Sequence, residues 1–281
     1  AMEAYKSMWT QIANRYKEYS DHLIFEGANE EIGARFDENS DLYCDDSVTT
    51  YYTDDEKYEL ANQINQTFVD TVRATGGNNA SRFLLIPGFG TNIDQTCDDR
   101  FVMPTDSAKD KLLISVHYYD PWSYCGDGQS TVKWGTKSDI EYMMNQLAKM
   151  DKFTEKGYGV IIGEYGVLYS TQVQENTLTY HRSFLDVCDL HNFQSCLWDC
   201  SAFFNRRTLQ MVPELASLYA KRNVEAFQLM TQEEEGIMAT RRLNETLSQA
   251  PESFRQDAIQ VDADSAVAWI MWNSGSYTET Y

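Results

Sequence analysis

The chain has 281 residues and a net charge of −20, from 23 Lys and Arg against 43 Asp and Glu. A chain this acidic repels phosphate backbones, which argues against nucleic acid as a partner and favours a neutral or cationic one. Hydrophobic residues make up 42% and aromatic residues 13% of the chain, which excludes disorder as its overall state. No apolar run approaches the roughly 18 residues of a membrane span, so no membrane partner is expected.

Apolar segments of strand length alternate with amphipathic segments of helix length. We expect helices at Met8–Tyr19, Glu59–Ala74, Asp139–Met150, Tyr180–Leu190 and Pro213–Met230. We expect strands at Asp21–Glu26, Arg82–Pro87, Lys111–Tyr118, Gly159–Gly163 and Phe193–Trp198. The strands are apolar on both faces, which is typical of a parallel sheet covered by helices and built from βα units.

Two segments depart from this alternation. Residues Asp37–Glu56 hold eight acids and no base, which predicts a solvated loop; a calcium site is the alternative, although the spacing matches no EF-hand. Asn223–Gln249 is expected to form one or two helices, with Glu233–Gly236 between them. A strand at Ala258–Trp272 would follow, as a sheet addition, the start of a truncated module or an oligomerisation arm.

The six cysteines form no C-x-x-C pair, and the four histidines are scattered. A zinc site is therefore not expected. The even number of cysteines allows three disulfides, but a core of barrel size does not need them. The first residues lack the basic and apolar character of a signal peptide, and a mature or excised fragment would look the same.

Two carboxylates stand at the ends of predicted strands. Glu30 comes shortly after the first strand, and Glu164 follows Gly159–Gly163 directly. Parallel α/β sheets and barrels build their ligand sites at the carboxyl ends of their strands, so we expect both side chains in one cleft. Two facing carboxylates are what glycoside hydrolysis requires. Taken singly, each could equally be a surface acid at the end of a strand.

The same edge collects three further side chains with fitting chemistry. His117 and Tyr119 lie at the end of a third strand, and Trp198 lies at the end of a fourth. A tyrosine hydroxyl can keep a carboxylate ionised, and a tryptophan face can stack on a sugar ring. The alternative for His117 is a strand-end histidine with a structural partner. The alternative for Trp198 is a core aromatic.

Five stretches also carry a family likeness: Phe25–Glu30, Asn65–Asn79, Val116–Trp122, Ile162–Gly166 and Leu197–Trp198. In content and order they resemble glycoside hydrolase family 5, in its endo-β-1,4-glucanase (cellulase) branch. The resemblance covers roughly Met8 to Arg222. It implies a (β/α)₈ TIM-type barrel, a retaining mechanism and no cofactor or metal.

The resemblance also implies roles for individual residues. Glu30 matches the acid/base and Glu164 the nucleophile, while Asn29 matches the residue that bonds the sugar 2-hydroxyl. His117 and Tyr119 match the pair lining the reaction centre, and Trp198 matches the sugar platform. Trp122 and Trp134 lie in an aromatic loop as further sugar contacts, with loop packing as the alternative.

Two departures from the family pattern bear on these roles. Glu31 stands where the family usually has proline; it would raise the pKa of Glu30 by like-charge repulsion, or point into solvent. The first three βα units of the barrel have no counterpart, so the family's Arg from strand two and His from strand three are absent. The expected fold is an incomplete barrel of strands four to eight at residues 1–222, with a helical and strand extension at residues 223–281.

The missing units would leave the sheet with two open edges, which invite pairing with another chain. We therefore expect a homo-oligomer that completes or covers these edges, unless the tail strand covers one within the same chain. The implied partner is a cellulose-type β-glucan, and its polymeric nature implies extracellular action. The alternatives are a carbohydrate-binding relic without turnover, a mannanase or xyloglucanase of the same family, and an assembly protein.

Overall fold

The computed structural model of the chain describes residues 1–33, 36, 52–126, 133–167, 174–199, 203–226 and 231–254. One parallel sheet runs through it with its strands in chain order: β1 (Phe25–Glu26), β2 (Leu84–Pro87), β3 (Leu112–Tyr118), β4 (Gly159–Tyr165) and β5 (Gln194–Leu197). Parallel neighbours joined in sequence by helical crossovers are the arrangement of a barrel segment. The sheet confirms the predicted fold class and all five predicted strands.

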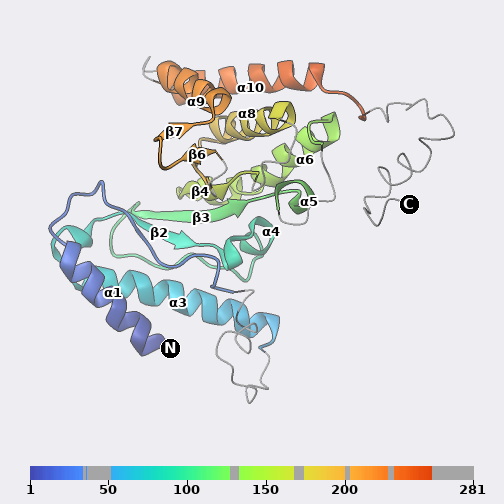
Figure 1. Cartoon of the computed structure of the whole chain (residues 1–281). Coiled ribbons are helices and arrows are strands. Elements are labelled where there is room, and N and C mark those ends of the chain that lie inside the picture. The colour runs from blue at the N-terminus through green and yellow to red at the C-terminus, as the bar shows by residue number, and fades with distance from the viewer. Residues whose placement is uncertain are drawn as a thin grey trace, which may run out of the picture.

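Helices cover the outer side of this sheet (Figure 1). The long ones are α1 (Met2–Tyr16), α3 (Asp54–Ala74), α6 (Lys137–Ala148), α8 (Gln174–His191), α9 (Pro213–Ala226) and α10 (Gln232–Gln249). The short ones are η2 (Gly77–Ala80), η3 (Phe89–Thr91), α4 (Ile93–Thr96), α5 (Trp122–Cys125) and α7 (Asp151–Thr154), and β6 (Phe204–Asn205) pairs with β7 (Gln210–Met211) in a small hairpin. Figure 1 shows α1 and α3 on one side of the molecule and α8, α9 and α10 on the other, with the sheet between them.

The hydrophobic core lies between the sheet and these helices. Phe184 of α8 is fully buried and stacks on Tyr165 of β4, with 3.9 Å between ring centroids. On β5, at the sheet edge, Gln194 and Cys196 are instead exposed. The prediction that both strand faces are apolar and covered thus holds for β2, where all four residues are buried. It is wrong for β5, which among the described residues pairs only with β4 and leaves Gln194 and Cys196 on one of its faces exposed.

A buried arginine holds β1 in place beside β2. Arg82 is fully buried, and its guanidinium donates hydrogen bonds to four backbone carbonyls of the α1–β1 connection and to Oδ1 of Asn79. It also lies over the ring of Phe25, 4.8 Å from the centroid. A buried charge is tolerated only when its donors are satisfied. This network fixes the short strand that leads to Glu30.

Several helices begin earlier than their apolar spacing predicts, and capping boxes explain the starts of two of them, α3 and α10. Thr53 accepts a hydrogen bond from the backbone of Glu56 and is bonded in return, so α3 begins at Asp54 and includes the last three acids of the predicted loop. Thr231 and Glu234 form the same capping box, so Glu233–Gly236 lies in α10 rather than between two helices. The negative charge of glutamates near a helix N-terminus also interacts favourably with the helix dipole.

The C-terminal region packs on the barrel segment. Leu243 and Ala239 of α10 are buried, and Arg242 bonds Asp186 and Asp189 of α8. The predicted boundary between residues 222 and 223 falls inside α9, and the two-part division remains a prediction. The predicted strand at 258–272 lies outside the described residues, as does the acidic stretch from 37 to 51.

Two further expectations concern the described part of the chain. Cys97, Cys125, Cys188 and Cys196 are free thiols, while Cys44 and Cys200 lie outside the described residues. Within the described ranges, no helix is long and apolar enough to cross a membrane.

Candidate active site

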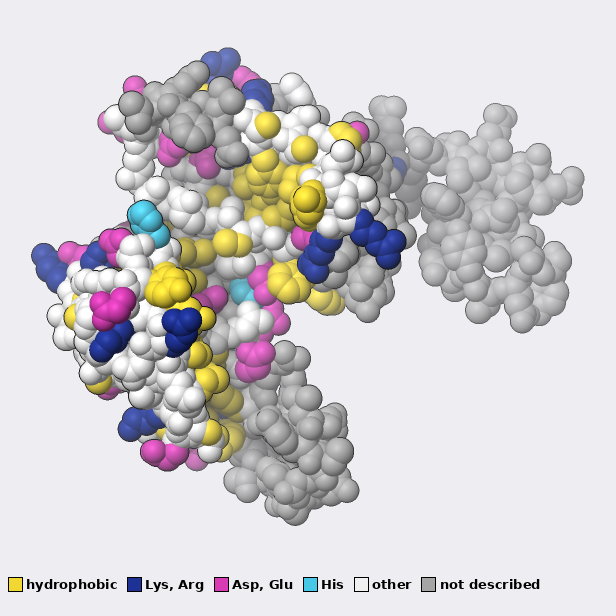
Figure 2. All heavy atoms as spheres, turned by 60° about the vertical axis from the view of Figure 1, so that its left-hand side comes forward, with side chains coloured by type: hydrophobic (Ala, Val, Ile, Leu, Met, Phe, Trp, Pro, Cys, Tyr) yellow, Lys and Arg dark blue, Asp and Glu magenta, His cyan; other side chains and the backbone are white. Residues whose placement is uncertain are grey.

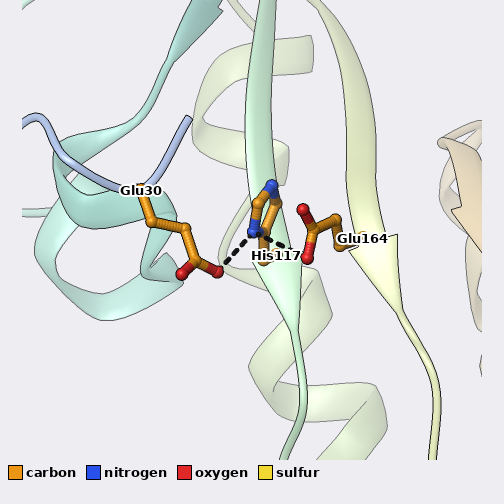
Figure 3. A group of neighbouring side chains, drawn as sticks. All are labelled: Glu30, His117 and Glu164. Carbon is orange, nitrogen blue, oxygen red and sulfur yellow. Dashed lines mark hydrogen bonds and ion pairs between the residues drawn. The ribbon is translucent and has the colours of Figure 1, made fainter. Parts of the chain in front are cut away.

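Three side chains from separate elements meet at the carboxyl edge of the sheet (Figure 3). Glu30 comes from the loop after β1, His117 from β3 and Glu164 from β4. Nδ1 of His117 lies 2.8 Å from Oε1 of Glu30 and 3.6 Å from Oε2 of Glu164. Nδ1 donates to Glu30 when that carboxylate is ionised, and it accepts when Glu30 carries the proton. The structure thus brings together the two predicted catalytic carboxylates.

A local irregularity of the sheet sets His117 opposite Glu164. The pairing of β3 with β4 runs Val116 to Ile162 and then His117 to Glu164, so that Gly163 is skipped. A Cβ at position 163 would lie 2.7 Å from Oγ of Ser115 and 3.3 Å from Nε2 of His117. Only glycine therefore lets the imidazole and the carboxylate sit directly across from each other.

The hydroxyl of Tyr119 orients the second carboxylate. It donates a hydrogen bond of 2.8 Å to Oε2 of Glu164, which fixes the direction in which this carboxylate points. The Glu164 side chain is 15% exposed, whereas that of Glu30 is 38% exposed. The more sheltered carboxylate is therefore the one held by tyrosine, as befits a nucleophile, and the more open one can exchange protons with water.

Two predicted sugar contacts present their rings to solvent near this group. Trp122 is 54% exposed and meets the ring of Tyr119 edge-on, with 6.2 Å between centroids. Trp198 is 47% exposed, and its backbone N–H is anchored to the carbonyl of Tyr165, next to Glu164. Both rings can take a sugar face. Asn29 is also exposed, directly before Glu30.

Trp134 does not join them. Its side chain is 2% exposed, and its ring packs edge-on against buried Tyr180, with 5.0 Å between centroids. A ring enclosed in the core offers no face to a ligand, so the predicted sugar contact is wrong and the packing alternative holds.

Glu31, which stands where the family usually has proline, is exposed to solvent.

One acid near the site was missed by the sequence reasoning. Glu26 is the last residue of β1, and partial desolvation raises the pKa of its carboxyl, with the neighbouring Glu164 charge acting in the same direction and His117 opposing it. The signal was present: Glu26 belongs to the same six-residue stretch as Glu30, and Phe25 before it points into the core. Alternation along the strand turns Glu26 to the opposite, inner face.

The fold and these side chains define a class of protein. A parallel βα barrel segment with two carboxylates facing each other at the strand ends is the arrangement of a barrel glycosidase. Figure 2 shows histidine and acidic side chains gathered in a hollow of the surface, with hydrophobic side chains nearby. The chain is identified more closely by comparison: residues 1–204 match the cellulase family, glycosyl hydrolase family 5. The chain belongs to this family.

Known proteins similar to the chain carry endoglucanase names. Endoglucanase A of Paenibacillus barcinonensis is 35% identical in an alignment of 199 positions that covers 63% of this chain and 46% of that protein. The structure of a broad specificity endoglucanase from an uncultured bovine rumen ciliate is 34% identical, with a TM-score of 0.63, over 75% of this chain and 61% of that one. The structure of a broad specificity endoglucanase from Ruminococcus champanellensis with bound cellotriose is 32% identical and has a TM-score of 0.65. This match covers 76% of this chain and 61% of that one. The chain thus spans less than half the length of the first relative.

Proposed function

We propose that the chain hydrolyses β-1,4-glucans as a retaining endoglucanase. The supporting observation is the spacing of its two carboxylates: one oxygen of Glu30 and one of Glu164 lie within 4.8 Å of each other. Retaining glycosidases hold their carboxyl groups about 5–5.5 Å apart, whereas inverting ones leave about 6.5–9.5 Å for a water. The close spacing fits direct attack by one carboxylate.

The proposed reaction has two steps. Glu164 attacks the anomeric carbon while Glu30 protonates the departing glycosidic oxygen, which leaves a glycosyl ester on Glu164. Glu30, now ionised, then takes a proton from a water, whose oxygen attacks the same carbon and returns Glu164 as carboxylate. Tyr119 orients Glu164 through its 2.8 Å bond, and His117 bonds Glu30.

A β-1,4-glucan fits the surroundings of these carboxylates. The exposed rings of Trp122 and Trp198 can stack on pyranose faces, and an uncharged polymer meets no repulsion from a chain of net charge −20. Endoglucanases are similar to this chain, and one of them binds cellotriose. Because the proposed substrate is a polymer, we also propose that the protein acts outside the cell.

The test is reducing-sugar release from a soluble β-1,4-glucan. Wild type should be active, Glu164→Gln should lose nearly all activity, and Glu155→Gln, at an exposed position beyond α7, should match wild type. Glu30→Gln should be slow on the polymer but should keep its first step on a glucoside whose leaving group needs no protonation. Equal activity in wild type and Glu164→Gln would refute the proposal.

A carbohydrate-binding relic without turnover is the second candidate. The observation in its favour is the open inner side of the sheet, where Glu26, Gln194 and Cys196 are exposed. If calorimetry shows weak binding of cello-oligosaccharides and no sugar is released, the chain is a carbohydrate-binding relic and not an endoglucanase. Hydrolysis of mannan or xyloglucan in preference to glucan would instead change the substrate within the same mechanism.

We also propose that the chain self-associates over its open edges. Among the described residues β1 pairs only with β2, and β5 pairs only with β4. Unpaired strand edges present backbone donors and acceptors to any neighbouring chain. Sedimentation velocity should show concentration-dependent dimers or larger species, whereas a single monomer boundary at all concentrations would refute self-association.

A further inference from the structure

The side chains of Glu30, His117 and Glu164 have a second property besides hydrolysis. Each offers one atom that can ligate a metal ion, and the three atoms lie within 4.8 Å of one another. Both carboxylates approach the same atom of the imidazole: Nδ1 lies 2.8 Å from Glu30 and 3.6 Å from Glu164 (Figure 3). A cation replacing the proton on Nδ1 would therefore meet both carboxylates at once.

We propose that these three residues form a binding site for Zn²⁺, which acts as an inhibitor rather than a cofactor. Zinc takes histidine nitrogen and carboxylate oxygen at about 2.0–2.2 Å in tetrahedral geometry, which separates neighbouring ligand atoms by about 3.3 Å. The Nδ1–Glu164 distance of 3.6 Å is already close to that spacing. The Nδ1–Glu30 distance has to open by about half an ångström, and the two carboxylate oxygens, which lie within 4.8 Å, have to close by up to about 1.5 Å. Rotations of the glutamate side chains allow both movements.

Charge favours a cation at this point. Two carboxylates face each other, and within the described residues no Lys or Arg side chain lies within 4 Å of the Glu164 carboxylate. The His117 side chain is 5% exposed and held in the sheet, so the nitrogen ligand is preorganised. The Glu30 side chain is 38% exposed, which leaves room for a water as fourth ligand, as in open zinc sites.

The identity of the metal follows from the donor set. Imidazole together with carboxylates suits Zn²⁺, whereas Mg²⁺ prefers oxygen ligands and retains its waters. Such a site could not be predicted from the sequence, because its ligands are far apart in the chain and no cysteine takes part. Bound zinc would occupy both carboxylates of the proposed mechanism, so sugar release should stop. Binding itself does not depend on the chain being active.

The test is calorimetric titration of ZnCl₂ into the tag-free, EDTA-treated and desalted full chain, in a buffer that does not bind metal. We expect one Zn²⁺ per chain with micromolar affinity, and no binding of MgCl₂ under the same conditions. Glu30→Gln, His117→Asn and Glu164→Gln should each weaken binding at least tenfold, with thermal unfolding showing that each variant is folded. His191→Asn removes a histidine that pairs with Asp151 at 2.9 Å away from these ligands and should bind zinc as wild type does.

A second readout uses Co²⁺ in place of zinc. Its visible absorption should have the intensity of a four-coordinate ion in wild type and should be lost in His117→Asn. The proposal is overturned if wild type binds no zinc, if Mg²⁺ binds equally well, or if His191→Asn abolishes binding while the other three variants do not. None of these results depends on hydrolysis, so failure of this proposal and failure of the proposed function are distinguishable.

Discussion

At the scale of single residues, the motif stretches predicted which side chains would meet, but not how. Glu30, His117, Tyr119 and Glu164 lie together as expected. The skipped pairing at Gly163 that sets His117 against Glu164 could not be predicted, because apolar spacing does not reveal a bulge. Trp134 was misjudged for a related reason: a tryptophan in a polar loop looks alike whether it faces solvent or packs on Tyr180.

The bond from Tyr119 to Glu164 gives the first prediction. Tyr119→Phe removes a charge-assisted hydrogen bond worth about 1.5–3 kcal/mol, and we expect kcat on β-1,4-glucan to fall roughly 10- to 150-fold. Because the hydroxyl acts on the nucleophile, oligosaccharide affinity measured by calorimetry should stay unchanged. Tyr142→Phe, at an exposed tyrosine of α6, is the matched control. Unchanged kcat in Tyr119→Phe would show that the bond does not support the reaction.

Gly163 carries the second prediction. Gly163→Ala would place a methyl group 2.7 Å from Ser115 and 3.3 Å from His117, so the imidazole has to move away from the carboxylates. We expect a loss of activity of at least tenfold, because small misplacements of reacting groups are costly. Gly236→Ala in α10, where the added methyl meets nothing within 4 Å, should keep full activity. Wild-type kinetics in Gly163→Ala would refute this account of the bulge.

Buried His181 gives a prediction on pH. Its ring lies among Tyr165, Tyr180 and Phe203, and neither nitrogen has a hydrogen-bond partner among the residues that the structure describes. Burial lowers its pKa to about 3. Below the ordinary histidine pKa of about 6.5 the unfolded chain binds a proton that the folded chain cannot. Stability is therefore fully present above that pH and falls by about 1.4 kcal/mol per pH unit as the pH drops toward 3.

Urea unfolding at pH 7.5 and pH 5.5 tests this sign. His181→Phe should lose less free energy of unfolding between the two pH values than wild type, by about 1–1.5 kcal/mol. His22→Gln, at an exposed histidine, should lose as much as wild type. Equal losses in wild type and His181→Phe would contradict the buried neutral histidine.

At the scale of secondary-structure elements, the sequence predicts which helices and strands exist, and in which order, better than it predicts the residues at which they begin and end. All five predicted strands are present in chain order, because long apolar segments in a βα alternation have few other readings. Helices α3 and α10, for example, begin earlier than the apolar spacing predicts. Their capping boxes, Thr53 with Glu56 and Thr231 with Glu234, draw acidic residues into the first turn that composition alone assigns to loops.

The docking of α10 onto α8 yields a prediction with neighbouring residues as test and control. Arg242 bonds fully buried Asp186 and half-buried Asp189, so Arg242→Gln should lower the free energy of unfolding by about 1.5–3 kcal/mol. Arg241 pairs only on the exposed side of the helix, with Glu245, so Arg241→Gln should leave stability unchanged. Urea unfolding of both variants measures the two changes in the free energy of unfolding. Equal changes would mean that the bonds of Arg242 to Asp186 and Asp189 do not hold α10 on α8.

At the scale of the whole molecule, the part of the chain that the structure describes is a barrel segment with exposed residues on the inner side of its sheet. Its five strands follow one another in parallel order, and similar endoglucanase structures extend beyond what this chain covers. Composition and charge could predict a globular acidic chain, but not which surface stays uncovered, because that depends on how neighbouring elements pack. The exposed inner side of β5 is where a second copy would add its contacts.

The central claim is that Glu164 attacks sugar to form a covalent intermediate. The most direct measurement is mass spectrometry of the intact chain after incubation with a 2-deoxy-2-fluoro cello-oligosaccharide bearing a good leaving group, which slows breakdown of the glycosyl ester. We predict one added glycosyl group per chain, mapped to the peptide containing Glu164 and absent from Glu164→Gln. An unlabelled chain, or a label on another residue, would contradict the account.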